Sequence, residues 1–179
     1  SYIMNKLFVA ALKEETPGLD YFHYIGVGKI NATYNLLKLI NKFKPNQIIN
    51  FGSAGAVNHS LSGIVECTKF YQRDMDVRGL LDFKLGETPF DDVNEIIYSD
   101  EGFSCGSGDS FVKNKIEIDV DLVDMEAYAL AKVCKLENIK FRCFKYVSDR
   151  ADGNAPNDWT ENCKKGAKLF RNKLKEFGL

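Results

Sequence analysis

The sequence predicts an α/β protein whose sheet is covered by helices on both faces. Short apolar runs of strand length alternate along the chain with segments in which apolar residues recur every three or four positions. Several of the apolar runs end in polar or small residues that are typical of turns. In an α/β sheet of this kind, ligands bind outside the C-terminal ends of the strands. Residues that follow the strands are therefore the first candidates for a functional site.

The first third of the chain predicts two strands and a helix. An apolar run at 6–12 indicates a buried strand that stops at the polar residues of 13–18, and a second short strand covers 22–25. Gly26 and Gly28 then precede the helix. Its apolar face consists of Leu36, Leu37, Ile40 and Phe43.

The middle of the chain predicts three further extended segments. A strand at 47–51 runs into the residues GSAG at 52–55, which we expect to form a turn because they are small. The stretch 63–70 is strand-like, and a short extended run with glycines lies at 102–108. Between these two, 73–92 is polar and irregular, which indicates a surface excursion.

The last third predicts a helix, a strand and a second helix. Asp124 is the expected N-cap of a helix at 125–136, and a strand at 141–147 ends in the dipeptide Ser148-Asp149. Apolar residues at three- and four-residue intervals then predict one long amphipathic helix over 158–176. The stripe consists of Trp159, Cys163, Ala167, Phe170, Leu174 and Phe177.

The composition is that of an ordinary globular protein. A length of 179 residues predicts one domain over 1–179, and because Met4 follows three other residues we expect the natural chain to start there. The 24 basic and 25 acidic residues nearly cancel, so we expect no binding to nucleic acid. No apolar run approaches the roughly 18 residues of a membrane span, so we expect no membrane partner.

The cysteines and histidines give no sign of a metal site. Five widely spaced cysteines, none at CxxC distance, predict reduced thiols and a cytoplasmic location. A zinc site would need clustered Cys and His, but the chain has only two histidines. We therefore expect neither a metal nor a cofactor.

Carboxylates follow predicted strands or turns at three places, which would bring them to one end of the sheet. They are Glu15, Asp124 with Glu126, and Asp149. Paired carboxylates suit a reaction in which one donates a proton while another activates water. Solvated surface charge and helix capping stay open as alternatives on this pattern alone. A dinucleotide site and a nucleophile elbow are rejected, because the third glycine of the first and the GxSxG spacing of the second are missing.

Three ordered motifs resemble those of a known family. NFGSAG at 50–55, VDMEA at 123–127, and VSD followed by AD at 147–152 are similar to the motifs of the purine nucleoside phosphorylase superfamily. The branch they resemble most is that of the 5′-methylthioadenosine/S-adenosylhomocysteine nucleosidases. The resemblance implies a three-layer α/β sandwich with a central mixed sheet flanked by helices. It also implies an enzyme that hydrolyses the N-glycosidic bond of a purine nucleoside.

The resemblance assigns roles to individual residues. Glu15 would activate the attacking water, and Asp149 would protonate the departing purine, which requires a raised pKa. The implied substrate-binding residues are Ser53 and Lys145 beside the water, Phe111 and Val112 at the purine, Met125 and Glu126 at the ribose, Ser148 beside Asp149, and Trp159 over the 5′ substituent. Core packing explains Trp159 equally well. Lys145 replaces the family's usual arginine, and Asp124 stands where the nucleosidases often have glutamate.

Water is the favoured nucleophile. Asn50 stands where phosphorolytic relatives commonly carry an arginine, and a carboxylate at Glu15 would repel a phosphate dianion. Lys29 and Lys145 leave a phosphate-dependent phosphorylase open as an alternative. The segment between Glu15 and Ile25 is shorter than in typical relatives, which also leaves open a non-catalytic nucleoside-binding protein.

The expected partner is a small-molecule purine nucleoside, of the adenosine type in these relatives. The residues QRDMDV at 72–77 resemble a region that relatives extend toward the pocket of a partner subunit. We therefore expect a homodimer.

Overall fold

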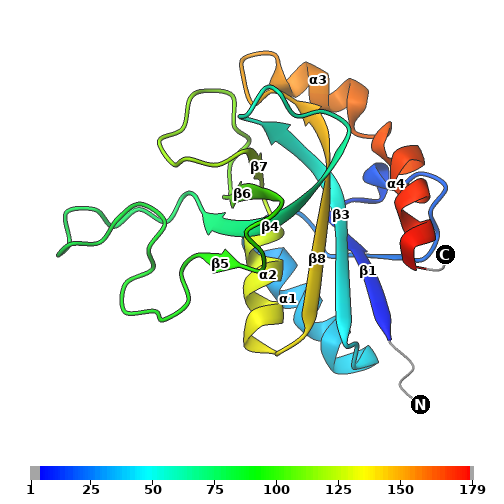
Figure 1. Ribbon diagram of the computed structural model, residues 1–179, viewed down its shortest axis with the longest axis horizontal. Helices are drawn as coiled ribbons and strands as arrows, with labels where there is room; N and C mark the ends of the chain where they lie inside the picture. The colour runs from blue at the N-terminus through cyan, green and yellow to red at the C-terminus, as the bar shows by residue number, and fades with distance from the viewer. Residues whose placement is uncertain (1–4, 178–179) are drawn as a thin grey trace.

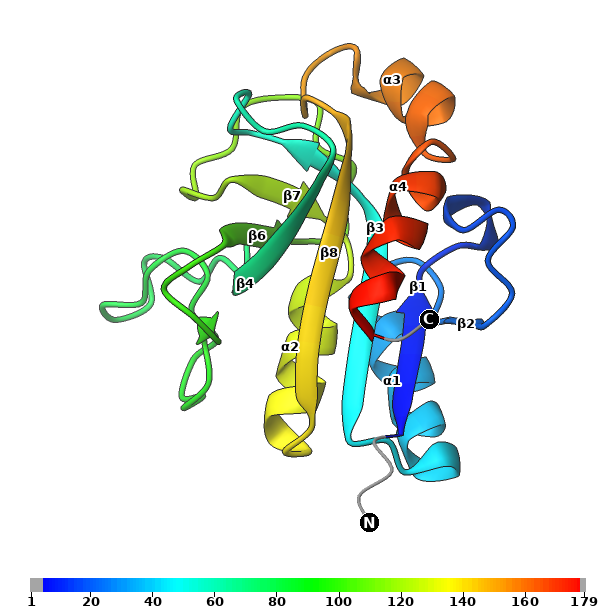
Figure 2. The same cartoon turned by 45° about the vertical axis from the view of Figure 1, so that its right-hand side comes forward.

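The computed structural model describes residues 5–177 and contains one mixed sheet of eight strands with helices on both faces (Figures 1 and 2). The expected start at Met4 lies outside the described residues. The strands are β1 (Lys6–Ala10), β2 (Phe22–Tyr24), β3 (Gln47–Ala56), β4 (Ile64–Gln72), β5 (Ile96–Ile97), β6 (Phe103–Ser107), β7 (Leu122–Asp124) and β8 (Lys140–Asp149). The helices are α1 (Lys29–Phe43), α2 (Ala127–Leu136), α3 (Ala155–Asn162) and α4 (Gly166–Leu174), with short 3₁₀ turns η1 (Lys13–Glu15) and η2 (Lys175–Phe177). The predicted three-layer α/β sandwich with a mixed sheet is confirmed.

The sheet combines an open parallel part with a closed ring. β2, β1, β3 and β8 lie side by side and are all parallel. β8 also pairs antiparallel with β4, which continues through β6 to β7, and β7 pairs antiparallel with the far end of β3. The strands β3, β8, β4, β6 and β7 therefore close on one another. This closure brings the C-terminal ends of β3, β7 and β8 together.

The two faces of the sheet pack against different helices, as the alternation of side chains along a strand requires. Leu7 and Val9 of β1 belong to the core under α1 and α2. Phe8 and Ala10, one position further along, belong to the core under α4, which contributes Phe170. The prediction that helices cover both faces of the sheet is confirmed by these two separate cores.

The segment GSAG does not form the predicted turn. β3 continues through it to Ala56, and Gly52, Ser53 and Ala54 pair in register with β8. Small residues are common in turns, which is why the sequence indicated one. Here they are small because side chains of the functional site lie against this end of the strand.

The prediction of one continuous helix over 158–176 is wrong. The chain forms two helices, α3 and α4, which are separated at residues 163–165. A Cβ atom at Gly166 would come within 2.5 Å of the ring of Tyr146 on β8. The helical segment therefore approaches the sheet at a glycine and changes direction there, so Trp159 does not share the apolar stripe of α4.

The surface excursion is longer than the residues 73–92 predicted from polarity. Residues 73–95 contain neither helix nor strand and project from the edge of the sheet in Figure 1. The two short strands β5 and β7 escaped prediction because each is only two or three residues long. In the described part of the chain, no helix has the length and apolar character needed to cross a membrane.

Candidate active site

A cavity of ≈ 250 Å³ opens where the C-terminal ends of β1, β3, β7 and β8 meet. Every site residue predicted from the sequence lines it except Lys145. The residues that line the cavity are Ala11, Leu12, Glu15, Val27, Ser53, Ala54, Gly55, Arg73, Ser110, Phe111, Val112, Val123, Asp124, Met125, Glu126, Ser148, Asp149 and Trp159. The cavity is thus built from segments spread over most of the chain.

Glu15 is held at one end of the cavity by three donors. It sits in η1 directly after β1, and its Oε1 accepts a hydrogen bond from the Leu12 amide at 3.1 Å. Its Oε2 accepts from both the amide and the hydroxyl of Ser53, at 2.6 and 2.8 Å. A Cβ atom at Gly52 would lie 3.3 Å from this same oxygen, so the glycine leaves room for the carboxylate beside β3. Glu15 is buried but points at the cavity.

Asp149 lies at the end of β8, where the strand has a bulge. The register with β3 shifts between Ala54 and Gly55, so Ser148 is skipped and Asp149 pairs with Gly55. The carboxylate accepts hydrogen bonds from the Ala151 amide at 2.9 Å and from the Ser148 hydroxyl at 3.0 Å. Burial raises its pKa, and the nearby Asp158 and Asp152 add to the rise against the two hydrogen bonds.

Gly55 is the position that makes room for Asp149. A Cβ atom there would come within 2.6 Å of the aspartate Oδ1, closer than real Cβ contacts. The two glycines of GSAG therefore each leave space for a carboxylate: Gly52 for Glu15 and Gly55 for Asp149.

Glu126 lines the same cavity, at the N-terminus of α2. Its Oε2 accepts a hydrogen bond from the amide of Gly28, at 3.0 Å, just before α1. Burial, with the negative charge of Asp124 close by, raises the pKa of Glu126 to about 8.

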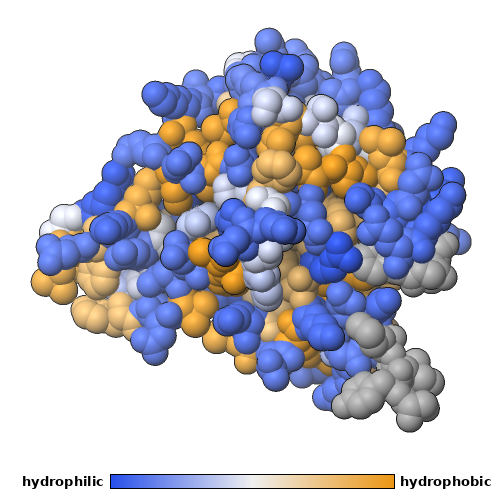
Figure 3. Space-filling view, viewed as in Figure 1, coloured by the Kyte–Doolittle hydropathy of each residue, from blue (hydrophilic) through white to orange (hydrophobic). Residues whose placement is uncertain are grey.

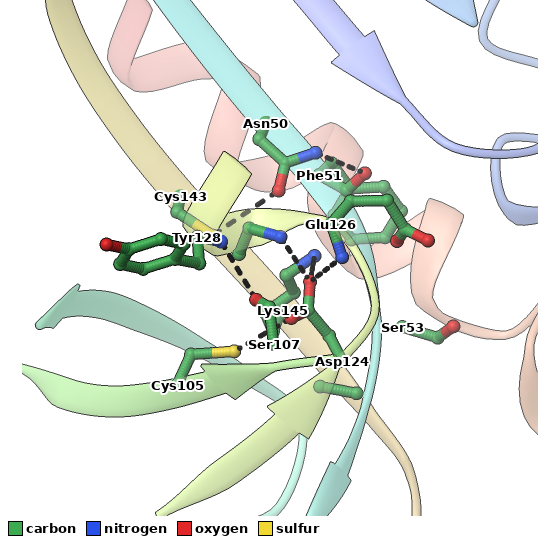
Figure 4. Close-up of polar contacts among 12 residues, drawn as sticks. Asn50, Phe51, Ser53, Cys105, Ser107, Asp124, Glu126, Tyr128, Cys143 and Lys145 are labelled. Atoms are coloured by element: carbon green, nitrogen blue, oxygen red, sulfur yellow. Dashed lines mark hydrogen bonds and ion pairs between the residues drawn. The ribbon is translucent and has the colours of Figure 1, made fainter. Parts of the chain in front are cut away.

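Lys145 lies beneath the cavity and not in it. Its Nζ forms an ion pair with Asp124 Oδ2 at 3.0 Å, and both side chains are almost fully buried (Figure 4). Burial opposes both charges, but the attraction between them lowers the pKa of Asp124 and raises that of Lys145. The ammonium group is also within 3.1 Å of the position a Gly52 Cβ would occupy. The Lys145 ammonium group and the Glu15 carboxylate therefore lie on the same side of Gly52.

Asp124 caps α2 without being its N-cap residue. The helix begins at Ala127, later than predicted, with Glu126 at the N-cap position. The Asp124 carboxylate accepts hydrogen bonds from the amides of Ala127 and Glu126, at 2.8 and 3.2 Å, and from the Ser107 hydroxyl (Figure 4). The predicted capping role thus coexists with the ion pair to Lys145.

Arg73 is the site residue that the sequence did not reveal. It follows β4 directly and is buried against the cavity. Its guanidinium donates to the carbonyls of Gly106, Gly108, Ser110 and Asp124 and to the Ser110 hydroxyl. These bonds fix the loop that carries Phe111 and Val112. The strand-end rule that selected Glu15 would have found Arg73 only if β4 had been predicted to reach Gln72.

The comparisons with known proteins place this chain in a defined family. Residues 96–177 match the model of the phosphorylase superfamily. The 5′-methylthioadenosine/S-adenosylhomocysteine nucleosidase of Staphylococcus aureus strain JH9 is 32% identical over 158 residues, covering 73% of this chain and 68% of the relative. The chain belongs to this nucleosidase family, and the predicted class of enzyme, a purine nucleosidase, is confirmed.

Solved structures agree with the fold. The 5′-methylthioadenosine/S-adenosylhomocysteine nucleosidase of Helicobacter pylori, in complex with a substituted pyrrolidin-3-ol, superposes with a TM-score of 0.85 at 21% identity and covers 97% of this chain and 99% of its own. The futalosine hydrolase of the same organism gives 0.83 at 20% identity, with 98% and 100% covered. Proteins named for different substrates share this fold, so the fold by itself does not select the substrate.

Proposed function

We propose that this protein hydrolyses the N-glycosidic bond of an adenosine-type nucleoside, such as 5′-methylthioadenosine or S-adenosylhomocysteine, and releases the free base. The observation that carries the proposal is the placement of Glu15 and Asp149 in one cavity, each with a different environment. The first accepts three hydrogen bonds that fix both of its carboxylate oxygens. The second has a raised pKa that favours its protonated form.

Glu15 acts as the general base on water in this proposal. The donors from Leu12 and Ser53 stabilise its carboxylate, which takes a proton from water as the oxygen attacks C1′ of the ribose. The fixed orientation of both carboxylate oxygens contributes to catalysis because the base needs no reorganisation when the reaction occurs.

Asp149 acts as the general acid. It gives its proton to the five-membered ring of the purine, and the bond between C1′ and the ring nitrogen breaks with its electrons leaving on the base. Burial supports this role because it keeps the carboxyl protonated at a higher pH than an exposed aspartate. Ser148 orients the carboxyl through its hydroxyl.

The remaining lining residues bind the substrate between these two groups. Met125 packs on the ribose, and Glu126 binds the ribose hydroxyls from its place beside the Gly28 amide. Phe111 and Val112 contact the purine from the loop that Arg73 holds. Lys145 acts from below through its ion pair and not through contact with substrate.

Water is preferred to phosphate because the cavity has few available cations. Among the described residues that line it, Arg73 is the only cationic one, and its guanidinium is already bonded to backbone carbonyls. Lys29 is paired with Asp74 at 2.7 Å, and Lys145 is paired with Asp124. The two lysines that kept phosphorolysis open are thus both engaged with carboxylates.

The test is a nucleoside panel with and without phosphate. Methylthioadenosine, adenosylhomocysteine, adenosine and inosine are incubated with the protein, and free base is measured. We expect base release that does not depend on phosphate. Release only when phosphate is present would establish a phosphorylase, and tight binding without any release would establish a nucleoside-binding protein.

We also propose a homodimer in the cytoplasm. Leu80, Leu81 and Phe90 are 52%, 71% and 83% exposed on the surface excursion, and Figure 3 shows hydrophobic surface where this segment projects. Contiguous exposed apolar surface is typical of an interaction site. The five cysteines are free and buried, as suits a reducing compartment. Light scattering at graded protein concentration measures the oligomeric state, and a mass that stays monomeric would refute the dimer.

A further inference from the structure

We propose that Trp159 is a positioning residue for the general base, acting through its indole N–H on the hydroxyl of Ser53. This inference rests on the proposed function, in which Glu15 is the base. The indole Nε1 donates a hydrogen bond to Ser53 Oγ at 2.9 Å, and this hydroxyl donates in turn to Glu15 Oε2 at 2.8 Å. A cover for the 5′ substituent would need only the aromatic ring. This contact uses the polar edge of that ring.

The two hydrogen bonds fix the direction of the Ser53 proton. A serine hydroxyl has one proton and two acceptor positions, and it rotates to suit its neighbours. Because the indole is a donor only, it occupies an acceptor position of Ser53 and leaves the proton to point at Glu15. Without the indole, the hydroxyl is free to turn its proton toward the substrate water. It would then compete with Glu15 for orienting the nucleophile.

The helix that carries Trp159 is anchored at the other catalytic end as well. Asn162, three residues later on α3, donates from its side-chain amide to the Ser148 carbonyl at 3.2 Å. Residues three apart lie on the same face of a helix. One face of α3 therefore contacts the serine beside each catalytic carboxylate, which holds the indole in place over Ser53.

The experiment compares Trp159→Phe, Ser53→Ala and the double variant in steady-state release of base from methylthioadenosine. Phenylalanine keeps a six-membered aromatic ring and removes the five-membered ring that carries the N–H donor. Thr160→Ala is the matched control on α3, because its hydroxyl bonds only to the carbonyl of Pro156 in its own helix. We expect Trp159→Phe to lower kcat roughly 3- to 10-fold, the effect of losing one hydrogen bond. KM should change less than about 2-fold, since the lost contact does not bind substrate.

The double variant gives the decisive comparison. If the indole acts through Ser53, adding Trp159→Phe to Ser53→Ala has no further effect on kcat. If the ring instead covers the 5′ substituent, Trp159→Phe raises KM for methylthioadenosine but not for adenosine, and it does so in the Ser53→Ala background too. That result would overturn the inference.

A second readout does not depend on turnover. Trp159 is the single tryptophan of the chain, so the tryptophan fluorescence of the protein comes from this residue alone. Ser53→Ala should shift its emission, whereas Thr160→Ala should not. An unchanged spectrum in Ser53→Ala would refute the contact. Absence of base release by the unaltered protein would instead refute the proposed function and leave the fluorescence result intact.

Discussion

The two ends of the cavity each hold a buried carboxyl group, but the two groups have different neighbours. Glu15 accepts three hydrogen bonds that engage both of its oxygens. Asp149 accepts two, and its acidic neighbours and burial raise its pKa. In the proposed mechanism, this difference in surroundings assigns the base to Glu15 and the acid to Asp149. Both surroundings are built on one strand pair, β3 and β8, whose glycines Gly52 and Gly55 leave space for the two carboxylates.

The strongest test of this comparison is Asp149→Asn, which removes the proposed acid and preserves its shape. We expect the rate of base release to fall by about 10²- to 10⁴-fold, the usual contribution of a general acid. Substrate binding, measured by thermal stabilisation with methylthioadenosine, should persist. Retention of more than about a tenth of the rate would show that the purine leaves without this proton.

The glycines test the same comparison without changing either carboxylate. Gly55→Ala forces a Cβ atom to within 2.6 Å of Asp149, whereas Gly52→Ala approaches Glu15 and Lys145 at 3.3 and 3.1 Å. A displacement of about 1 Å at a reacting group costs on the order of 100-fold in rate. We expect such a loss of kcat for Gly55→Ala and a smaller loss for Gly52→Ala. Circular dichroism checks that both variants are folded. Equal activities would contradict the spacing argument.

Glu126 tests whether burial controls protonation elsewhere in the cavity. Because its pKa is raised to about 8 from an ordinary 4.5, its contribution to stability is fully present below pH 4.5 and is lost as the pH rises toward 8. Glutamine does not titrate, so Glu126→Gln removes this pH-dependent loss of stability. The difference in Tm between Glu126→Gln and the unaltered protein should therefore grow from pH 5 to pH 8. The exposed Glu137→Gln is the control and should show no such trend.

The smallest effect is expected where the loop that carries Phe111 meets α1. Lys29 bridges Asp74 and Asp109, and the Asp109 carboxylate accepts from the Lys29 amide at 2.9 Å. These groups are partly exposed, so each pair contributes only about 0.2–1 kcal/mol. Asp74→Asn should raise KM for the nucleoside roughly 2- to 5-fold, as 1.4 kcal/mol corresponds to 10-fold. A fall in kcat at constant KM would contradict this expectation and show that the Lys29 bridge affects the catalytic step instead of substrate binding.

Much of the fold and the site could be predicted from the sequence because strand ends carry the functional residues. Glu15, Ser148 and Asp149 follow apolar runs that are visible without a structure, and the ordered motifs identified the family. Arg73 escaped because its partners are backbone carbonyls, which have no signature in the sequence. The prediction that Lys145 lies in the cavity is wrong. The sequence does not show its buried ion pair with Asp124, because that pair depends on how strands distant in the chain are arranged in the sheet.

The hydrogen bonds that hold this cavity together have a consequence for folding kinetics. They join residues that are 38, 98 and 106 positions apart, at Ser53 with Glu15, Gly28 with Glu126, and Trp159 with Ser53. Contacts between residues so distant in the chain form slowly, because long loops must close first. During refolding, helical and strand signals should therefore return before the ability to release base. The active site is a late product of the folding reaction.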